Sequence, residues 1–195
     1  AQSLVKDINV LTANGGSTPS APYDTGLGYA LFAANDGTNG TELWRTDGTP
    51  MGTVLVKDIN TSAAGASSSP VSFATLGTLV CFAANDGVNG TELWVTDGTT
   101  AGTTLLVNIA TGSASSLPAS FVAFGGRLLF KADDGFNGAE LWATDGTVAG
   151  TALLRDINHG SASSTPTNLV RLGRSELYEA TDGNSGVDRW LSDRT

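Results

Sequence analysis

Short apolar runs rich in β-branched and aromatic residues alternate along the chain with clusters of Gly, Asn, Asp and Ser. The clearest set predicts four strands, at Val71–Leu76, Thr78–Ala84, Thr91–Thr96 and Thr103–Ile109. Apolar residues do not recur at the three- to four-residue spacing of an amphipathic helix. The pattern therefore predicts an all-β protein.

One eight-residue motif, Glu-Leu-Trp-x-Thr-Asp-Gly-Thr, recurs through the sequence. It stands at Glu42–Thr49, Glu92–Thr99 and Glu140–Thr147, and a diverged copy fills Asp188–Thr195. A period of about 50 residues indicates a repeat architecture in which each repeat is one supersecondary unit. Within a repeat, the tryptophan is expected to pack between units, and the preceding leucine to point to the opposite face of its strand.

Four antiparallel strands per unit are typical of a propeller blade. We predict a four-bladed β-propeller with blades at residues 22–60, 70–110, 118–158 and 166–195. Residues 1–10 contain Leu4-Val5-Lys6-Asp7-Ile8-Asn9, which matches the last strand of the other repeats, Leu55–Asn60 for example. We expect this segment to complete blade 4 and close the ring. An open segment of a larger ring and a β-solenoid or sandwich are the alternatives.

The composition narrows the function classes. The net charge is -9 and only 15% of residues are charged, which disfavours binding to nucleic acid and to anionic membranes. No apolar run reaches 18 residues, so membrane insertion is not expected. The abundance of Ser, Thr, Gly and Asn suggests a secreted or cell-surface protein. The single cysteine, Cys81, lies in an apolar run and is expected to be a buried thiol.

The motifs ELWRTDGTPMGT, ELWVTDGTTAGT and ELWATDGTVAGT resemble the bacterial ELWxxDGT-repeat proteins, and the resemblance covers nearly the whole chain. It implies a secreted or surface-displayed repeat protein and no defined chemistry. The fourth repeat departs from the pattern, with Asp188-Arg189 in place of Glu-Leu and Arg194 in place of the turn glycine. Its arginines, Arg174 included, are expected to pair with Asp182, Asp188 and Asp193, or to contact an acidic partner.

Acidic loops form the first candidate site. We call the loops between the second and third strands of each repeat the tip loops; the last strands end at the same edge. Carboxylate oxygens in glycine-rich loops suit Ca²⁺. The alternative is that these side chains only fold tight turns, and Glu42, Glu92 and Glu140 are expected to pair with basic groups or lie solvated. The candidate calcium ligands are Asp36, Asp86, Asp134, Asp182, Asp7, Asp58 and Asp156.

A glycan is the favoured ligand, because sugars need polar groups for their hydroxyls and an aromatic face for stacking. Phe136, in the third tip loop, takes the place of Thr38 and Val88 and is the best candidate contact. Packing of that loop on its neighbour is the competing interpretation. Asn39, Asn89 and Asn137 supply polar groups at equivalent positions.

Signals for catalysis are weak. His159 is the one histidine, and no nucleophile–base arrangement accompanies it. Carboxylates recur in every repeat, so a carboxylate-pair glycoside hydrolase is a remote alternative. The sequence favours a non-catalytic binding or adhesion module, with a glycan or another surface protein as partner and calcium as an optional cofactor. A structural building block of a matrix, filament or surface layer, with self-association, is the second hypothesis.

Overall fold

The computed structural model describes residues 3–11, 16–173 and 175–192, and these contain fifteen strands and no helix. The strands form four antiparallel sheets in chain order, blades 1 to 4. The fold is an all-β, four-bladed β-propeller, which confirms the predicted class. No helix in the described part of the chain is long and apolar enough to cross a membrane.

The strand bounds follow the repeat. Blade 1 holds β1 (Tyr23–Asp24), β2 (Ala30–Asn35), β3 (Thr41–Thr46) and β4 (Val54–Lys57). Blade 2 holds β5 (Val71–Leu76), β6 (Leu79–Asn85), β7 (Thr91–Thr96) and β8 (Thr104–Val107). Blade 3 holds β9 (Ala119–Phe124), β10 (Arg127–Asp133), β11 (Ala139–Thr144) and β12 (Ala152–Arg155). Blade 4 holds β13 (Thr167–Leu172), β14 (Ser175–Thr181) and β15 (Val187–Ser192).

The hydrophobic core lies between successive sheets. Trp94 and Phe82 of blade 2 pack on Leu31 and Leu43 of blade 1, and all four side chains are buried. Leu93, next to Trp94, belongs instead to the cluster between blades 2 and 3. Each blade thus has a front face toward the preceding blade and a back face toward the next, as the alternation of leucine and tryptophan predicts. Burial of side chains this large contributes about 2 kcal/mol each.

The fourth strand of blade 2 is shorter than the predicted Thr103–Ile109, because the chain leaves the sheet after Val107. The pairing of β7 with β8 is irregular between Leu93 and Trp94. Beyond it, the amide of Ile109 donates to a carboxylate oxygen of Glu92 rather than to a strand. A side-chain acceptor therefore ends the strand and turns the backbone toward blade 3.

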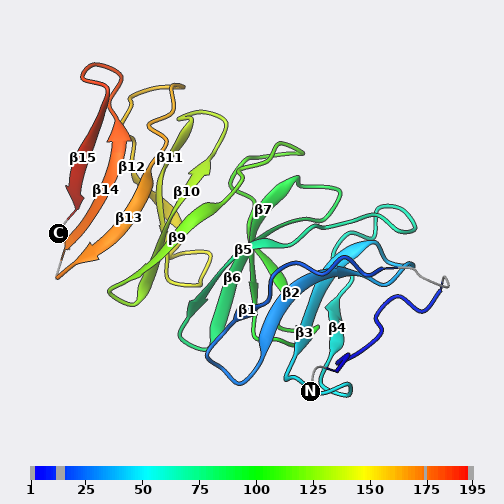
Figure 1. The fold of residues 1–195 in the computed structure, drawn as a ribbon. Helices are drawn as coiled ribbons and strands as arrows, with labels where there is room; N and C mark the ends of the chain where they lie inside the picture. The colour runs from blue at the N-terminus through cyan, green and yellow to red at the C-terminus, as the bar shows by residue number, and fades with distance from the viewer. Residues whose placement is uncertain (1–2, 12–15, 174, 193–195) are drawn as a thin grey trace.

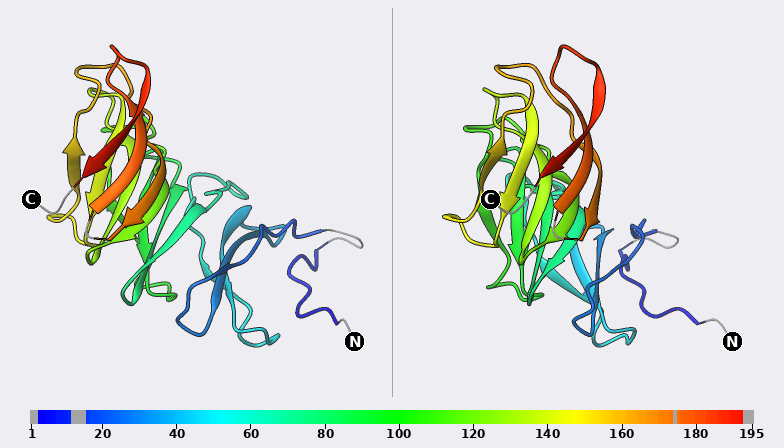
Figure 2. Two further views of the ribbon diagram at one scale, coloured as in Figure 1. Left: turned by 60° about the vertical axis from the view of Figure 1, so that its left-hand side comes forward. Right: turned by 90° about the vertical axis from the view of Figure 1, so that its left-hand side faces the viewer.

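The N-terminal segment corrects the predicted ring closure. Among the described residues, blade 4 has three strands, and residues 3–10 form no strand with β15. Those residues lie at the blade 1 end of the row, whereas β15 lies at the opposite end (Figures 1 and 2). The four blades form an open row. Residues 1 and 2 of the predicted segment lie outside the described residues.

The segment nevertheless makes contacts with blade 1 like those that the last strand of one blade makes with the next blade. Lys6 Nζ donates to the carbonyl of Thr53 at 2.7 Å, just as Lys57 Nζ donates to that of Thr103 at 2.7 Å. Ile8 packs on the cluster formed by Phe32, Ala34 and Trp44. These contacts keep the segment on blade 1, which is the physical reason why it does not complete blade 4.

Candidate functional site

Each tip loop is closed by its own aspartate. Asp36 Oδ1 accepts hydrogen bonds from the amides of Thr38 and Asn39, both at 2.8 Å. Its Oδ2 accepts from Asn39 Nδ2 at 2.8 Å. The same three bonds recur in blades 2 and 3, where Asp86 binds Val88 and Asn89, and Asp134 binds Phe136 and Asn137. In blade 4, Asp182 Oδ1 accepts from the amides of Asn184 and Ser185.

These bonds hold the tip-loop aspartates in their ionised form. Partial burial raises the pKa of Asp86, but the hydrogen bonds from Asn89 and Val88 outweigh it and leave the pKa below its ordinary value. The pKa values of Asp36 and Asp134 are lowered for the same reasons. The carboxylates are charged at neutral pH, and their oxygens are occupied by the loop itself.

The candidate calcium ligands are not gathered around common points. The described residues contain no group of three or more His, Cys, Asp or Glu side chains arranged to hold a metal ion. Asp7 is exposed, and Asp156 lies 3.5 Å from the exposed His159. Within the described ranges, Asp58 and Asp156 each keep one buried Oδ1 without a hydrogen-bond partner, and so does Asn108 at the equivalent position of blade 2. Such positions suit an ordered water molecule.

The glutamates of the repeated motif are buried, which corrects the expectation that they pair with basic groups or lie solvated. Glu42, Glu92 and Glu140 have no exposed surface. Glu92 accepts from the amide of Ile109 at 2.7 Å, from the amide of Ser116 at 2.9 Å and from the Ser116 hydroxyl at 2.6 Å. Glu42 makes these bonds with Ile59 and Ser68, and Glu140 with Ile157 and Ser164.

Burial of the carboxylate raises the pKa of Glu92, and the hydrogen bonds from Ser116 and Ile109 offset part of that rise. The pKa of Glu42 is raised in the same way. A signal for this role was present in the sequence. A serine stands two residues before the proline that leads into each of blades 2, 3 and 4, as in Ser116-Leu117-Pro118. Propensity rules alone do not connect residues 24 apart.

The arginine expected to pair with loop aspartates makes a different contact. Arg189 Nε lies 3.5 Å from Glu179 Oε1, a residue of the neighbouring strand, rather than pairing with Asp182 or Asp188. Arg174, Asp193 and Arg194 lie outside the described residues. In the other blades the position of Arg189 holds a buried leucine, so the back face of blade 4 is more polar than those of blades 1 to 3.

Exposed apolar side chains break the symmetry of the tip-loop edge at blades 2 and 3. Phe136 is 70% exposed, Val88 is 65% exposed and Leu117 is 61% exposed. The amide of Leu117 donates to the carbonyl of Thr91, where β7 begins after the tip loop of blade 2. The equivalent positions elsewhere in the repeats are polar, namely Thr38 and Asn184 in the tip loops and Ser69 and Thr165 in the linkers. The exposed aromatic predicted at Phe136 is therefore present, with aliphatic residues on the same edge.

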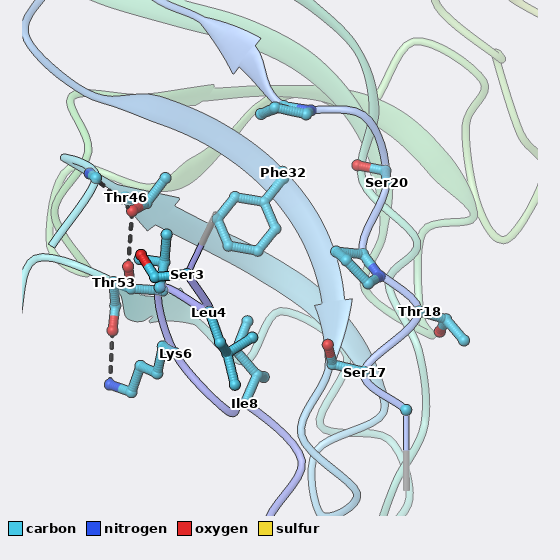
Figure 3. A pocket seen from close by; sticks show the side chains of 15 residues that line it. Ser3, Leu4, Lys6, Ile8, Ser17, Thr18, Ser20, Phe32, Thr46 and Thr53 are labelled. Atoms are coloured by element: carbon cyan, nitrogen blue, oxygen red, sulfur yellow. Dashed lines mark hydrogen bonds between the residues drawn. The ribbon is translucent and has the colours of Figure 1, made fainter. Parts of the chain in front are cut away.

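A separate apolar pocket of about 610 Å³ lies between the N-terminal segment and the front face of blade 1 (Figure 3). Leu4, Ile8 and Phe32 line it, and Lys6 is the one charged side chain among its lining residues. Lys6 is held by the carbonyl of Thr53, whose hydroxyl in turn contacts that of Thr46 at 2.6 Å. In blades 2, 3 and 4 the front face is covered by the back face of the preceding blade. The pocket occupies the corresponding place on the front face of blade 1. It offers packing surface and no acid–base pair.

Comparisons with known proteins define the fold and little more. No protein-family model and no curated protein sequence matches the chain. Among solved structures, puromycin hydrolase is similar at a TM-score of 0.60 with 16% identity over 94% of this chain. A prolyl endopeptidase is similar at a TM-score of 0.56 with 12% identity over 92%. Both have a β-propeller domain, and the chain spans 28% of the length of each. At these identities the likeness shows the fold alone.

Proposed function

We propose that the chain is a non-catalytic, secreted or surface-displayed binding module that contacts a glycan through the tip-loop edge of blades 2 and 3. The observation that carries the proposal is the exposed ring of Phe136, held on a loop whose backbone is fixed by Asp134. An aromatic face on a rigid polar loop suits stacking against a sugar ring. Asn137, in the same loop, and the exposed Leu117 and Val88 extend the surface.

The proposed contact does not depend on calcium. The oxygens of Asp134 already accept three hydrogen bonds within the loop, which leaves little of this carboxylate free for a cation. Asn39 and Asn89 have the same arrangement in their own loops but lack a neighbouring aromatic ring. The proposed site therefore does not include calcium, and the binding experiment below is run both with and without it.

The repeated acids do not favour the hydrolase alternative. A carboxylate-pair mechanism needs one acid to donate a proton and another to act as a nucleophile or base in a shared cleft. Glu42, Glu92 and Glu140 are instead fully buried and bound to backbone amides and serine hydroxyls. These three glutamates therefore stabilise the linkers between successive blades.

A glycan array with the full chain tests the proposal. Phe136→Ala is expected to weaken binding to any glycan that the wild type recognises by about tenfold or more, the cost of one lost stacking contact. Val148→Ala is the matched control, because Val148 is 64% exposed in the same blade but follows β11 at the opposite edge. Equal binding by wild type and Phe136→Ala would remove the proposed site. Each arm is run with Ca²⁺ and with EDTA.

The structural building block is favoured by a different observation. Among the described residues, β15 has one paired edge, and an unpaired strand edge is a template for association with another chain. Sedimentation velocity over a wide concentration range tests this second candidate. Concentration-dependent oligomers that persist in Phe136→Ala would support it independently of glycan binding.

A further inference from the structure

Glu176 of β14 is a buried carboxylate with no hydrogen-bond partner in the part of the chain that the structure describes. It is 1% exposed, and neither of its carboxylate oxygens has a hydrogen bond among the described residues. The equivalent positions of blades 2 and 3 hold Val80 and Leu128, which are buried apolar residues. An acid in this place has no role in the repeat and a large desolvation cost.

The side chain lies in the joint between blades 3 and 4. Tyr178 and Ala180 follow at two-residue intervals on the same face of β14, and both pack with Leu129 and Leu141 of blade 3. Val80 of blade 2, the equivalent of Glu176, packs against blade 1 in the joint between blades 1 and 2. Glu176 therefore belongs to the surface through which blade 4 packs on blade 3.

The charged groups around this surface leave Glu176 uncompensated. Its neighbour on β13 is Arg171, whose Nε donates to the carbonyl of Gly173, and its neighbour on β15 is the uncharged Ser192. Arg127 and Lys131 alternate with Leu129 on the same side of β10. Arg155 and Glu140, of β12 and β11, act on the pKa of Tyr178, as does Glu176 itself. None of these cations forms an ion pair with Glu176 among the described residues.

We propose that Glu176 makes the packing of blade 4 on blade 3 sensitive to pH, so that the joint is tight while the acid is protonated and loosens when it ionises. A neutral carboxylic acid can remain in an apolar joint at moderate cost, whereas an unpaired carboxylate cannot. Loosening exposes the front face of blade 4, including Tyr178. The other blade joints carry Val80 and Leu128 at this point and lack the response.

The pH window follows from the direction of the shift. Burial raises the pKa of Glu176 from 4.5 to about 7. The packed state therefore binds the proton more tightly than the loosened state, in which the acid is solvated. The stabilisation is complete below pH 4.5 and is lost as the pH rises through 7. Between these limits the opening equilibrium should rise by about tenfold per pH unit and then level off.

Hydrogen–deuterium exchange of the full chain between pH 5 and 8, corrected for intrinsic amide rates, tests the proposal. In the wild type, the protection of β13, β14 and β15 should fall by roughly tenfold or more across this range. The protection of β5 to β8 should change much less, because the buried Glu92 of β7 accepts three hydrogen bonds that offset part of the rise in its pKa. The tip-loop aspartates do not interfere, because their pKa values are lowered from 3.8.

Two substitutions and one control separate the proposed role from a general pH effect. Glu176→Gln keeps the shape without the charge, and Glu176→Val installs the residue of blade 2; both should keep blade 4 protected at pH 8. Glu179→Gln, on the opposite face of the same strand, should retain the wild-type profile. An unchanged pH profile in Glu176→Gln would overturn the proposal. So would a wild-type profile that is flat, or one in which all four blades lose protection together.

Discussion

Glu92 and Ser116 are 24 residues apart and joined by two hydrogen bonds, from the serine amide and the serine hydroxyl to the carboxylate. The glutamate is the second residue of β7, and the serine lies in the linker that leads into blade 3. The same contact recurs between Glu42 and Ser68. A buried carboxylate that would destabilise an apolar core is here stabilised by hydrogen bonds from two backbone amides and a hydroxyl.

Loss of this contact should be costly. Glu92→Ala leaves the amides of Ile109 and Ser116 buried without an acceptor, and we expect it to lower the free energy of unfolding by about 2–4 kcal/mol. Denaturant unfolding measures the effect. Glu179→Ala, at a partly exposed ion pair, should cost less than about 1 kcal/mol. Similar losses for the two variants would contradict the role assigned to Glu92.

Calcium should not stabilise the chain. The tip-loop carboxylates are engaged by their own loops, and a ligand raises the midpoint of thermal unfolding only if it binds the folded state. A thermal melt with millimolar Ca²⁺ should therefore match one with EDTA. A rise of several degrees that Asp134→Ala removes would instead show a site at the tip loops.

The tip loops should lose their stabilising effect in acid. The folded-state pKa of Asp86 is below its unfolded value of 3.8, so its contribution is present above pH 3.8 and is lost as the pH falls through the lower, folded value. At pH 6, Asp86→Ala should cost about 1 kcal/mol through the lost loop bonds. Denaturant unfolding at a series of pH values should show the gap between wild type and variant narrowing below pH 3.8. A gap independent of pH would indicate that the ionised form is not the stabilising one.

Cys81 should be unreactive in the folded protein. The thiol is fully buried, and burial raises its pKa to about 12, so the reactive thiolate is scarce at neutral pH. A thiol reagent such as DTNB should label the chain at the rate of unfolding and label it fully in denaturant. Rapid labelling under native conditions would mean that the joint between blades 2 and 3 opens readily.

The sequence predicted local structure better than long-range connection. Strand positions and the opposed roles of Leu93 and Trp94 follow from alternation, which is a property of neighbouring residues. The contact of Glu92 with Ser116 does not, because nothing local distinguishes a buried acceptor from a solvated acid. The prediction that residues 1–10 close the ring was wrong for a related reason. The pattern of Lys6 and Ile8 identifies a last strand, but the choice of blade depends on packing that the pattern does not contain.

The candidate site divides in the same way. Exposure of Phe136 could be predicted from the residues that replace it in other repeats. For Asp36, Asp86 and Asp134 the sequence leaves both calcium binding and internal loop bonding open, and only the loop geometry shows which groups their oxygens contact. Glu176 was not recognised, because a single acid in a strand of mixed polarity resembles a solvent-facing residue until its neighbours are known.

The hydrogen bond from Lys6 to Thr53 repeats that from Lys57 to Thr103 although Lys6 belongs to no sheet. Blade 1 therefore binds a segment with the sequence of a last strand, although that segment is paired in no sheet of the described residues. The last-strand segment of one repeat thus packs on the sheet of the next repeat. Whole repeats can then be duplicated or deleted within such a gene while every remaining junction keeps both of its halves, because each half is encoded on its own side of the boundary.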